Sequence, residues 1–545
     1  MKPMPLRLAL TLCLLLLTGS LRAADAASLA GKRPNVVLIM VDDMGFSDLG
    51  CYGSEIQTPN IDALAAGGLR FTQFYNSGRC CPTRASLMTG LHPHQVGIGH
   101  MTETAEGPLG IEGPYQGHLN DRCTTLAEVL GAAGYHTLMT GKWHLGLHRR
   151  DNWPLQRGFD RYFGSLDGAV NYFVPGGQQT ITRGNDPYDV ADDFYATDAF
   201  TDHACDFLSE ATAADDRLFF LYLAYNAPHW PLNAKFADFE KYRGKYSDGW
   251  EPLMKARLAR QKEMGLFPAD VEPAPAVGPR WDSLSEKQRD DSDAIMAAYA
   301  GCLDSVDQNV GKLVAHLRAI GELENTVILF LSDNGACQES SMLGKGSEQM
   351  VRNPPQRTTD GVRLGMAWAN ACNTPFRLYK HFLHEGGSCT PMIASWPAAI
   401  EADQSGRFER NHAYLPDVMA TLVELSGGTY PSDIPQCEGR SMLPLLAGQD
   451  QPIHPEPIFW EHEGNAAVRE GEWKLVREYE KPWELYDLSA DRTEMHDLAA
   501  AEPDRRDAMI ALWTAYADRV GVAYPQRFNM YEHIQARKKQ QRTSK

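Results

Sequence analysis

The sequence of 545 residues lacks several features that would fix its class at once. Lys and Arg total 52 against 70 Asp and Glu. The resulting net charge of -18 argues against sequence-independent binding to nucleic acid or to an anionic membrane surface. The chain has no Cys-x-x-Cys pair, no zinc-spaced histidines and no internal repeat. With 43% hydrophobic residues it can bury a full core, which excludes a disordered, collagen-like or disulfide-stapled minimal protein.

Long apolar runs are absent after the first residues, and those first residues resemble a secretory signal. Lys2 and Arg7 precede an apolar run over residues 8–17, and small residues follow at 24–26. The run is too short to span a bilayer. We therefore predict a signal peptide over residues 1–26, a periplasmic or secreted protein, and no stable membrane insertion. The absence of any Asn-x-Ser/Thr sequon fits a bacterial periplasm better than a glycosylating route.

Short β-branched apolar runs alternate with helical stretches from residue 34 to about residue 448. This alternation is typical of an α/β domain with a large, mostly parallel sheet flanked by helices. The predicted strands are 36–41, 136–140, 218–224, 327–331 and 392–395, and the predicted helices are 61–66, 125–133, 293–320 and 416–425. Residues 240–290 are charged and then proline-rich, and we predict a surface excursion there.

The sequence changes in character near residue 449. Strand-like runs at 458–460, 466–469, 473–477 and 483–486 precede an amphipathic stretch over 504–520. We predict a smaller C-terminal α+β domain over residues 449–534, built from an antiparallel sheet and one helix. The main domain would then occupy residues 27–448, and residues 535–545 would form a polar tail.

Acidic and amide side chains directly follow two of the predicted strands. Asp42 and Asp43 come after the first strand, and Asp333 and Asn334 come after the strand 327–331. Ligands of an open α/β sheet bind beyond the carboxyl ends of its strands. Four oxygen-bearing side chains there would suit Ca²⁺ or Mg²⁺. Either pair alone could equally be an ordinary turn.

The most informative motif starts at Cys80. Cys80, Pro82 and Arg84, followed by Thr89 and Gly90, resemble the signature of the sulfatase family within the alkaline phosphatase superfamily, whose Cys is oxidised to formylglycine. A chance match is on the order of 10⁻⁴ for a chain of this length. Pro82 suits the first position of a helix, which would place Cys80 just before it, near free backbone N–H groups.

Further segments are similar to segments of the family and occur in the same order along the chain. Their sequences are most similar to those of bacterial arylsulfatases. They are Gly141–Gly146 with Lys142 and His144, Asn226–Pro231 with His229, Asn373–Lys380, and Glu385–Gly387. Gly158–Asp160 and Leu485–Leu488 are also family-like, and we interpret them as packing and turn residues. Each segment alone has an ordinary structural explanation. Chance matches, however, would not be expected to occur in the same order as the segments of the family.

The resemblance implies an alkaline-phosphatase-like fold and a sulfuric ester hydrolase that cleaves aryl or carbohydrate sulfate monoesters to alcohol and inorganic sulfate. The implied metal ligands are Asp42, Asp43, Cys80, Asp333 and Asn334, with Ca²⁺ favoured over Mg²⁺. The implied catalytic residues are Cys80 as formylglycine hydrate, Arg84, Lys142 and Lys380 as charge-offsetting groups, His229 as the acid for the leaving group, and His144 as the base for the second hydroxyl. A formylglycine-generating enzyme is the implied maturation partner.

Two other functions stay open at the level of the sequence. Formylglycine-dependent phosphonate monoester or phosphodiester hydrolases share this machinery, and kinetics alone would separate them. A secreted binding protein that kept the fold and lost activity is the second alternative. Substrate selectivity is expected from the aromatic loop 167–195 with Tyr172, Phe173 and Tyr188, from the segments 240–290 and 338–371, and from Trp460, Glu461 and His462.

Overall fold

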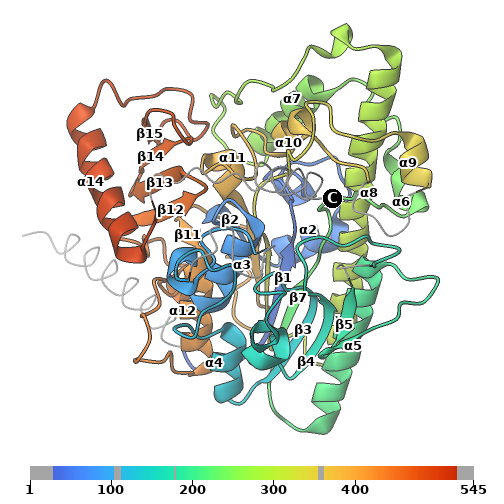
Figure 1. The fold of residues 1–545 in the computed structure, drawn as a ribbon, viewed down its shortest axis with the longest axis vertical. Coiled ribbons are helices and arrows are strands. Elements are labelled where there is room, and N and C mark those ends of the chain that lie inside the picture. The colour runs from blue at the N-terminus through green and yellow to red at the C-terminus, as the bar shows by residue number, and fades with distance from the viewer. Residues whose placement is uncertain (1–28, 103–111, 177–179, 354–360, 524–545) are drawn as a thin grey trace, which may run out of the picture.

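The computed structural model describes residues 29–102, 112–176, 180–353 and 361–523. The predicted signal peptide and polar tail lie outside these residues. The described chain forms one sheet of 11 strands and a second sheet of four (Figure 1). Along the large sheet the order is β10-β2-β9-β8-β1-β7-β3-β4-β5-β6, with β11 also paired to β2. None of the helices described is long and apolar enough to cross a membrane.

The strands of the large sheet are β1 (Asn35–Val41), β2 (Gly68–Tyr75), β3 (His136–Lys142), β4 (Arg161–Ser165), β5 (Ile181–Arg183), β6 (Asp186–Pro187), β7 (Phe219–Ala224), β8 (Thr326–Ser332), β9 (Cys389–Ser395), β10 (Phe408–Glu409) and β11 (Ala413–Tyr414). The helices are α2 (Pro59–Ala66), α3 (Cys80–Thr89), α4 (Leu126–Ala132), α5 (Ala196–Ala214), α6 (Phe236–Tyr242), α7 (Trp250–Glu263), α8 (Glu286–Ala319), α9 (Glu348–Arg352), α10 (Met366–Cys372), α11 (Glu385–Ser388), α12 (Leu415–Ser426), α13 (Leu443–Leu446) and α14 (Pro503–Val520). The five predicted strands and four predicted helices of the main domain are confirmed within a few residues at each end, except that α8 begins seven residues before the predicted 293.

Strand β1 lies in the middle of the large sheet and is apolar on both faces. Val37 and Ile39 point into the core beneath α2, α5, α6, α7 and α8, whereas Leu38 and Met40 point into the core beneath α3, α4 and α12. Continuous apolar sequence is expected for a strand that is covered on both sides. β1 pairs in parallel with β7 and β8, and β7 pairs in parallel with β3. The carboxyl ends of these four adjacent strands therefore meet at one edge.

The prediction that residues 240–290 form a surface excursion is wrong for the first half of the segment. Its first half forms the helix α7, and Arg257 on that helix is fully buried. The Arg257 guanidinium pairs with Asp48 at 2.6 Å and with Glu55 at 2.9 Å. The apolar pattern of this helix is weak in the sequence because its buried face combines Trp250, Met254 and Leu258 with the ion-paired Arg257.

The C-terminal sheet is confirmed as antiparallel. It contains β12 (Ile458–His462), β13 (Asn465–Glu470), β14 (Trp473–Arg477) and β15 (Glu484–Asp487), and α14 packs on it. Leu475, Leu485 and Trp513 are part of its own apolar core. The exact boundary near residue 449 stays a prediction.

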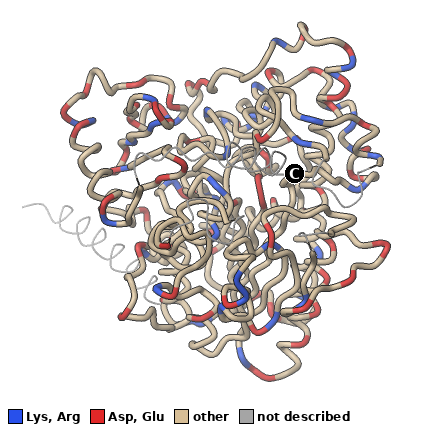
Figure 2. Tube along the Cα trace, viewed as in Figure 1, with Lys and Arg blue, Asp and Glu red and all other residues tan. Residues whose placement is uncertain are grey.

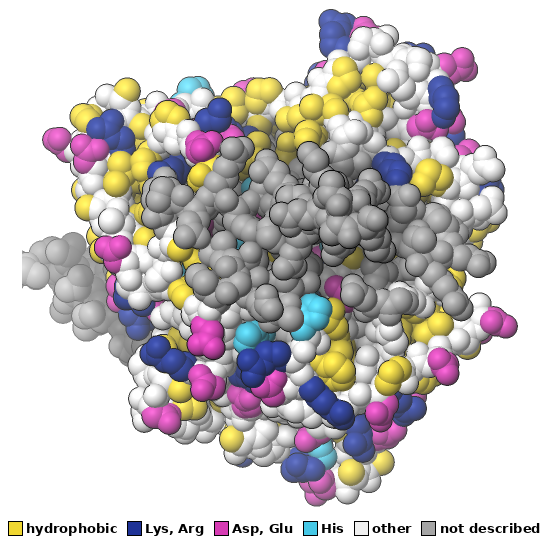
Figure 3. Space-filling view, in the orientation of Figure 1, with side chains coloured by type: hydrophobic (Ala, Val, Ile, Leu, Met, Phe, Trp, Pro, Cys, Tyr) yellow, Lys and Arg dark blue, Asp and Glu magenta, His cyan; other side chains and the backbone are white. Residues whose placement is uncertain are grey.

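The outer surface mixes side chains of all classes. Acidic and basic residues are spread along the outer elements (Figure 2), and on the face in Figure 3 hydrophobic side chains form small patches between charged ones. Among the described residues, the large exposed hydrophobic side chains are Phe236, Met342 and Met495. Isolated apolar side chains of this kind are normal for a protein surface.

A buried ionic cluster joins the two sheets. Lys474 on β14 is fully buried and contacts Glu385 at 2.8 Å and Glu494 at 2.9 Å. Arg492 contacts the second oxygen of Glu385 at 3.0 Å. Glu385 begins α11, five residues after Lys380, so the cluster ties the C-terminal sheet to a segment of the candidate site.

We expect Lys474→Met to lower the free energy of unfolding by about 3–5 kcal/mol, because it leaves two buried carboxylates without their shared cation. Urea denaturation followed by tryptophan fluorescence measures this loss. Lys287→Met is the control, since Lys287 is 79% exposed and pairs only with Asp291 on the same helix. A loss in Lys474→Met no larger than in Lys287→Met would contradict the interpretation.

Candidate active site

Four of the five residues expected to bind the metal converge at the carboxyl ends of β1 and β8. Asp42, Asp43, Asp333 and Asn334 are all fully buried. The backbone N–H of Asp43 donates to Asp333 Oδ1 at 3.2 Å, and Asn334 Nδ2 donates to Asp43 Oδ1 at 2.7 Å. Asp43 has a φ of 71°, a left-handed conformation that Asp tolerates better than most residues and that often marks functional sites.

The donor set fits one hard divalent cation. Asp42 Oδ1, Asp43 Oδ2 and Asn334 Oδ1 are buried and have no hydrogen-bond partner among the described residues. Such oxygens are costly to bury unless something coordinates them. Burial, and next the charge of Asp333, raise the pKa of Asp42 well above its ordinary value. A cation among these oxygens would oppose that shift and stabilise the ionised carboxylates.

Three predicted cations surround the carboxylates. Lys142 Nζ lies 2.5 Å from Asp42 Oδ2, and Lys380 Nζ lies 2.7 Å from Asp43 Oδ1. Arg84 donates to Asp333 Oδ2 at 2.8 Å. Burial acts against the charged form of both lysines, but the neighbouring Asp42 and Asp43 carboxylates raise the pKa of Lys142 and of Lys380 above the ordinary value. Both lysines therefore remain protonated at the base of the site.

Cys80 lies in the first turn of α3 and is buried. The helix begins at Cys80 rather than at Pro82, so the predicted helix start is wrong by two residues. Pro82 is still tolerated because the first turn has no intrahelical partner for its missing N–H. The neighbouring Cys81 thiol, and next Lys142 and His144, lower the pKa of Cys80 well below its ordinary value against the opposing effect of burial.

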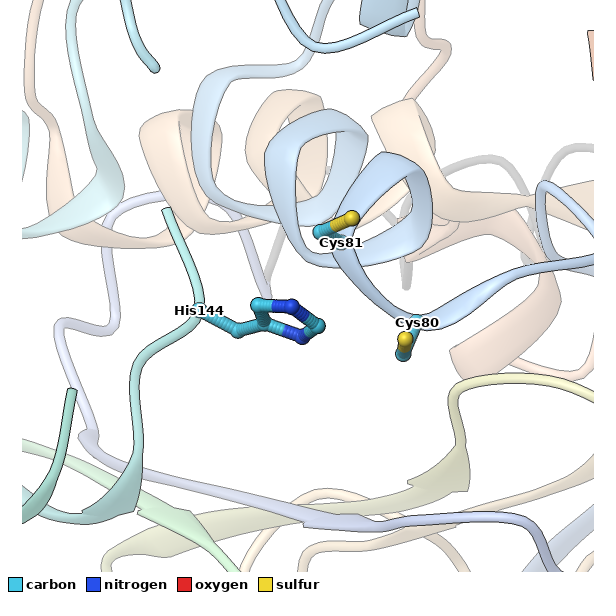
Figure 4. A group of neighbouring side chains, drawn as sticks. All are labelled: Cys80, Cys81 and His144. Atoms are coloured by element: carbon cyan, nitrogen blue, oxygen red, sulfur yellow. The ribbon is translucent and has the colours of Figure 1, made fainter. Parts of the chain in front are cut away.

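His144 approaches Cys80 from the loop after β3. Figure 4 shows its ring directed toward the start of α3, where Cys80 and Cys81 lie. Ligand atoms of these three residues lie within 4.8 Å of one another. The backbone of His144 has a φ of 59°, and a Cβ added to Gly168 would lie 2.6 Å from the His144 ring. A left-handed backbone and a glycine therefore fix this imidazole.

His229 lies on the opposite wall, after β7. Its Nδ1 lies 2.7 Å from the carbonyl oxygen of Trp230, which places the ring proton on Nδ1. Its Nε2 lies 3.6 Å from Asp43 Oδ2. Ligand atoms of His229, Asp43 and Asp42 lie within 4.8 Å of one another. Burial, followed by the charges of Lys380 and Lys142, lowers the pKa of His229 well below its ordinary value.

Two aromatic residues that were expected to face substrate have other contacts. Tyr172 is fully buried, and its hydroxyl donates to the carbonyl oxygen of His229 at 2.7 Å. Tyr188 packs edge-on against Phe163 at 5.2 Å between ring centroids. Tyr172 therefore supports the backbone of His229, and Tyr188 belongs to the packing of the sheet.

A chain of contacts that no sequence motif indicates lies beside Cys80. Arg79, which precedes Cys80, contacts Glu339 at 2.6 Å, and the Trp230 indole donates to the other oxygen of Glu339 at 3.0 Å. The Arg363 guanidinium lies 3.9 Å from the Trp230 ring centroid. Arg79 and Glu339 stand outside the family-like segments, so only their distance in the fold reveals them.

The side chains around residue 80 indicate a class of protein. A carboxylate and amide cluster suited to one divalent cation, three buried cations and two histidines surround one reactive side chain. Such a site can stabilise negative charge on a bound anionic ester while residue 80 attacks it. The arrangement is suited to a metal-assisted hydrolase of anionic esters.

Comparison with known proteins defines the family. A family model described as Sulfatase matches residues 34–428, and one described as N-sulphoglucosamine sulphohydrolase, C-terminal, matches residues 376–515. This chain belongs to the sulfatase family, and it is an enzyme that hydrolyses sulfate esters. The resemblance stated from the motifs is confirmed.

Individual relatives cover most of the chain. An uncharacterised sulfatase of Schizosaccharomyces pombe is 36% identical over 535 residues, which is 90% of this chain and 94% of that protein. The arylsulfatase of Klebsiella aerogenes is 32% identical over 429 residues, covering 76% of this chain and 90% of that one. The crystal structure of Ps i-CgsB in complex with k-i-k-neocarrahexaose matches with a TM-score of 0.68 and 26% identity, covering 93% and 97% of the two chains.

Proposed function

We propose that this protein hydrolyses sulfate monoesters of aryl alcohols or carbohydrates through a formylglycine that a maturation enzyme makes from Cys80. The observation that carries the proposal is the position of Cys80. It lies at the start of α3, within reach of His144 and surrounded by the charges of Lys142 and Lys380. The signal-like N-terminus supports maturation and action in the periplasm or outside the cell.

In this proposal Asp42, Asp43, Asp333 and Asn334, together with residue 80, hold one Ca²⁺ or Mg²⁺. When bound, the ion would make a hydroxyl of residue 80 more acidic and draw charge from a sulfate oxygen. When formed, the formylglycine hydrate supplies one hydroxyl that attacks sulfur and a second whose deprotonation releases sulfate.

The buried cations offset the charge of the substrate. Lys142 and Lys380 are protonated and held by Asp42 and Asp43, so they need little rearrangement to face a sulfuryl group. Arg84 reaches Asp333 and also donates to the carbonyl oxygen of Lys142 at 3.2 Å. Arg84 thereby fixes the start of α3 against a metal ligand and the Lys142 backbone.

The two histidines divide the proton transfers. His229 presents Nε2 toward the site, because Nδ1 faces the Trp230 carbonyl, and we assign it to protonate the leaving oxygen. Because its pKa is lowered, the negative charge of a bound substrate would favour its protonated form. Lys380, whose pKa is raised, is the alternative donor. His144 takes the proton of the second hydroxyl.

The relatives support two substrate classes. The Klebsiella aerogenes protein is named an arylsulfatase, and the Ps i-CgsB structure holds a neocarrahexaose. The N-acetylgalactosamine-6-sulfatase of Canis lupus familiaris is 30% identical over 482 residues, covering 84% of this chain and 74% of that one. We therefore propose aryl and carbohydrate sulfates as the classes to test.

Two measurements test the proposal. Mass spectrometry of the peptide that contains Cys80, from protein made in its native host, is expected to show the aldehyde in place of the thiol. Rates on aryl and sugar sulfates, and on matched phosphonate monoesters and phosphodiesters, are expected to favour the sulfates. An unmodified thiol in active protein would exclude the mechanism. A preference for the phosphorus esters would instead identify the protein as a phosphonate monoester or phosphodiester hydrolase.

Removal of the metal is expected to abolish hydrolysis. Dialysis against a chelator should remove activity, addition of Ca²⁺ or Mg²⁺ should restore it, and elemental analysis should find one ion bound through the Asp42 cluster. At 100 times the dissociation constant, the ion should add about 2.7 kcal/mol to the free energy of unfolding. Asn334→Ala should lose both the ion and the thermal shift. Full activity in metal-free protein would contradict the assignment.

A further inference from the structure

A second group of metal-binding side chains lies beside the Lys380 segment. His381 follows Lys380 directly, His462 ends β12, and Glu463 lies in the turn between β12 and β13. Ligand atoms of these three residues lie within 4.8 Å of one another. The group draws on both parts of the molecule, the loop that carries Lys380 and the C-terminal sheet.

The β12–β13 hairpin holds two of the three residues rigidly. His462 pairs with Asn465 across the hairpin, so only Glu463 and Gly464 form the turn. Both turn residues have positive φ angles, 50° and 84°, as in a type I′ turn. A Cβ added to Gly464 would lie 2.0 Å from the Tyr479 ring, so the turn also packs closely. His462 and Glu463 are therefore presented by a rigid element.

His462 is the side chain that requires an explanation. It is fully buried, and neither of its ring nitrogens has a hydrogen-bond partner among the described residues. A buried imidazole without such a partner is costly, and an unassigned ion is one of the few things that would satisfy it. Its Nε2 faces Glu463 Oε1 at 3.7 Å.

The distances suit a small four-coordinate ion. Zn²⁺ with nitrogen and oxygen ligands at ordinary bond lengths separates neighbouring ligand atoms by about 3.3–3.5 Å. His381 Nδ1 lies 3.3 Å from Glu463 Oε2, which is within this range. His462 Nε2 lies 3.7 Å from the other carboxylate oxygen, Oε1, so this ring would have to move slightly closer. Imidazole and carboxylate ligands are also the types that Zn²⁺ accepts.

His100 supports the carboxylate rather than acting as a ligand. Its Nδ1 accepts the backbone N–H of Met101 at 2.6 Å, which leaves the ring proton on Nε2. His100 Nε2 lies 3.0 Å from Glu463 Oε1. Orienting partners of this kind are typical of metal sites.

We propose that His381, His462 and Glu463 bind a second divalent ion, Zn²⁺ by preference, separate from the Asp42 cluster. Its fourth position would be open to water. The ion would join the loop of Lys380 to the C-terminal sheet, and its binding does not depend on the sulfatase mechanism. A second adjustment is required. Asn465 Nδ2 now faces His381 Nε2 at 3.2 Å, and the amide would have to turn its oxygen toward that nitrogen. This turn would give up the bond from Nδ2 to the His462 carbonyl oxygen and the bond from the Tyr479 N–H to Oδ1.

The test is a count of metal ions in the full-length protein. Chelator-treated protein is first saturated with Ca²⁺ and then titrated with Zn²⁺ against a chromophoric chelator, with elemental analysis of the product. We expect one tightly bound Zn²⁺ per chain. Co²⁺ in its place should show the intense visible bands of a four-coordinate site. Glu463→Gln, which keeps the shape, and His381→Ala, at a half-buried position, should each weaken Zn²⁺ binding at least about tenfold to a hundredfold.

Two control variants make the result specific. His136→Ala removes a histidine paired with Asp215 at 2.9 Å at the opposite end of β3, and it should leave Zn²⁺ binding unchanged. Asn334→Ala should also retain Zn²⁺, which shows that the ion is not at the Asp42 cluster. Equal Zn²⁺ affinity in Glu463→Gln and the unaltered protein would overturn the proposal. So would a change in KM for sulfated sugars with no bound Zn²⁺, because the cluster would then be a substrate contact.

Discussion

Replacement of Cys80 by Ser is expected to stop turnover while the fold is retained. A serine hydroxyl can attack sulfur once, but it has no second hydroxyl whose deprotonation would expel sulfate. Loss of a nucleophile that acts by covalent catalysis costs at least about 10³-fold in kcat. The variant should therefore release about one equivalent of alcohol per chain and then stop, with the sulfuryl group retained on residue 80. Stopped-flow product release and intact-mass spectrometry measure the two halves of this result.

Cys81→Ser is the matched control for Cys80→Ser. Cys81 is also buried in the first turn of α3, but its sulfur contacts the sulfur of Met101 at 3.5 Å. We expect this variant to keep formylglycine formation and most of its activity, with a modest loss of stability. Multiple turnovers at the unaltered rate by Cys80→Ser would show that residue 80 is not the nucleophile.

The sheet could be predicted from the sequence because its strands are buried on both faces. In β1 every residue from Val36 to Val41 is apolar, and this pattern leaves little choice of structure. The strands β2 and β4 and the short strands β5, β6, β10 and β11 carry no such run and were not predicted. Pairing with a neighbour, rather than composition, defines them.

The site residues that could be predicted from the sequence are those that follow the end of a buried strand. Asp42, Asp333 and His229 each follow a buried strand, and parallel strands bring their carboxyl ends together. Arg79 and Glu339 could not be predicted, because a distance of 2.6 Å between residues 260 positions apart leaves no local pattern. The cluster of His381 with His462 has the same origin, since it depends on how the C-terminal sheet docks.

The acidic net charge does not extend to the candidate site. The three buried carboxylates are matched by Arg84, Lys142 and Lys380, and a divalent ion would make the pocket positive. An acidic protein can therefore bind an anionic ester at short range, although its overall charge gives little long-range attraction for polyanions.

His229→Gln is expected to slow hydrolysis most for substrates whose leaving oxygen must be protonated as it departs. For alkyl or sugar sulfates, whose leaving oxygen is strongly basic, kcat should fall about 10²–10⁴-fold. For nitrophenyl sulfate, whose leaving group departs without a proton, the loss should be much smaller. His203→Gln, which alters a half-buried histidine packed against Phe163, is the control and should leave both rates unchanged.

The pH profile separates an acid from a structural role for His229. A general acid must be protonated, so kcat/KM for alkyl sulfates should be highest at low pH and fall as pH rises through the His229 pKa. Burial and the neighbouring lysines lower that pKa, so the fall should lie below the ordinary range of histidine. In His229→Gln this descending limb should disappear for alkyl sulfates. If the limb persists with the same midpoint, another group donates the proton, and Lys380 becomes the residue to alter next.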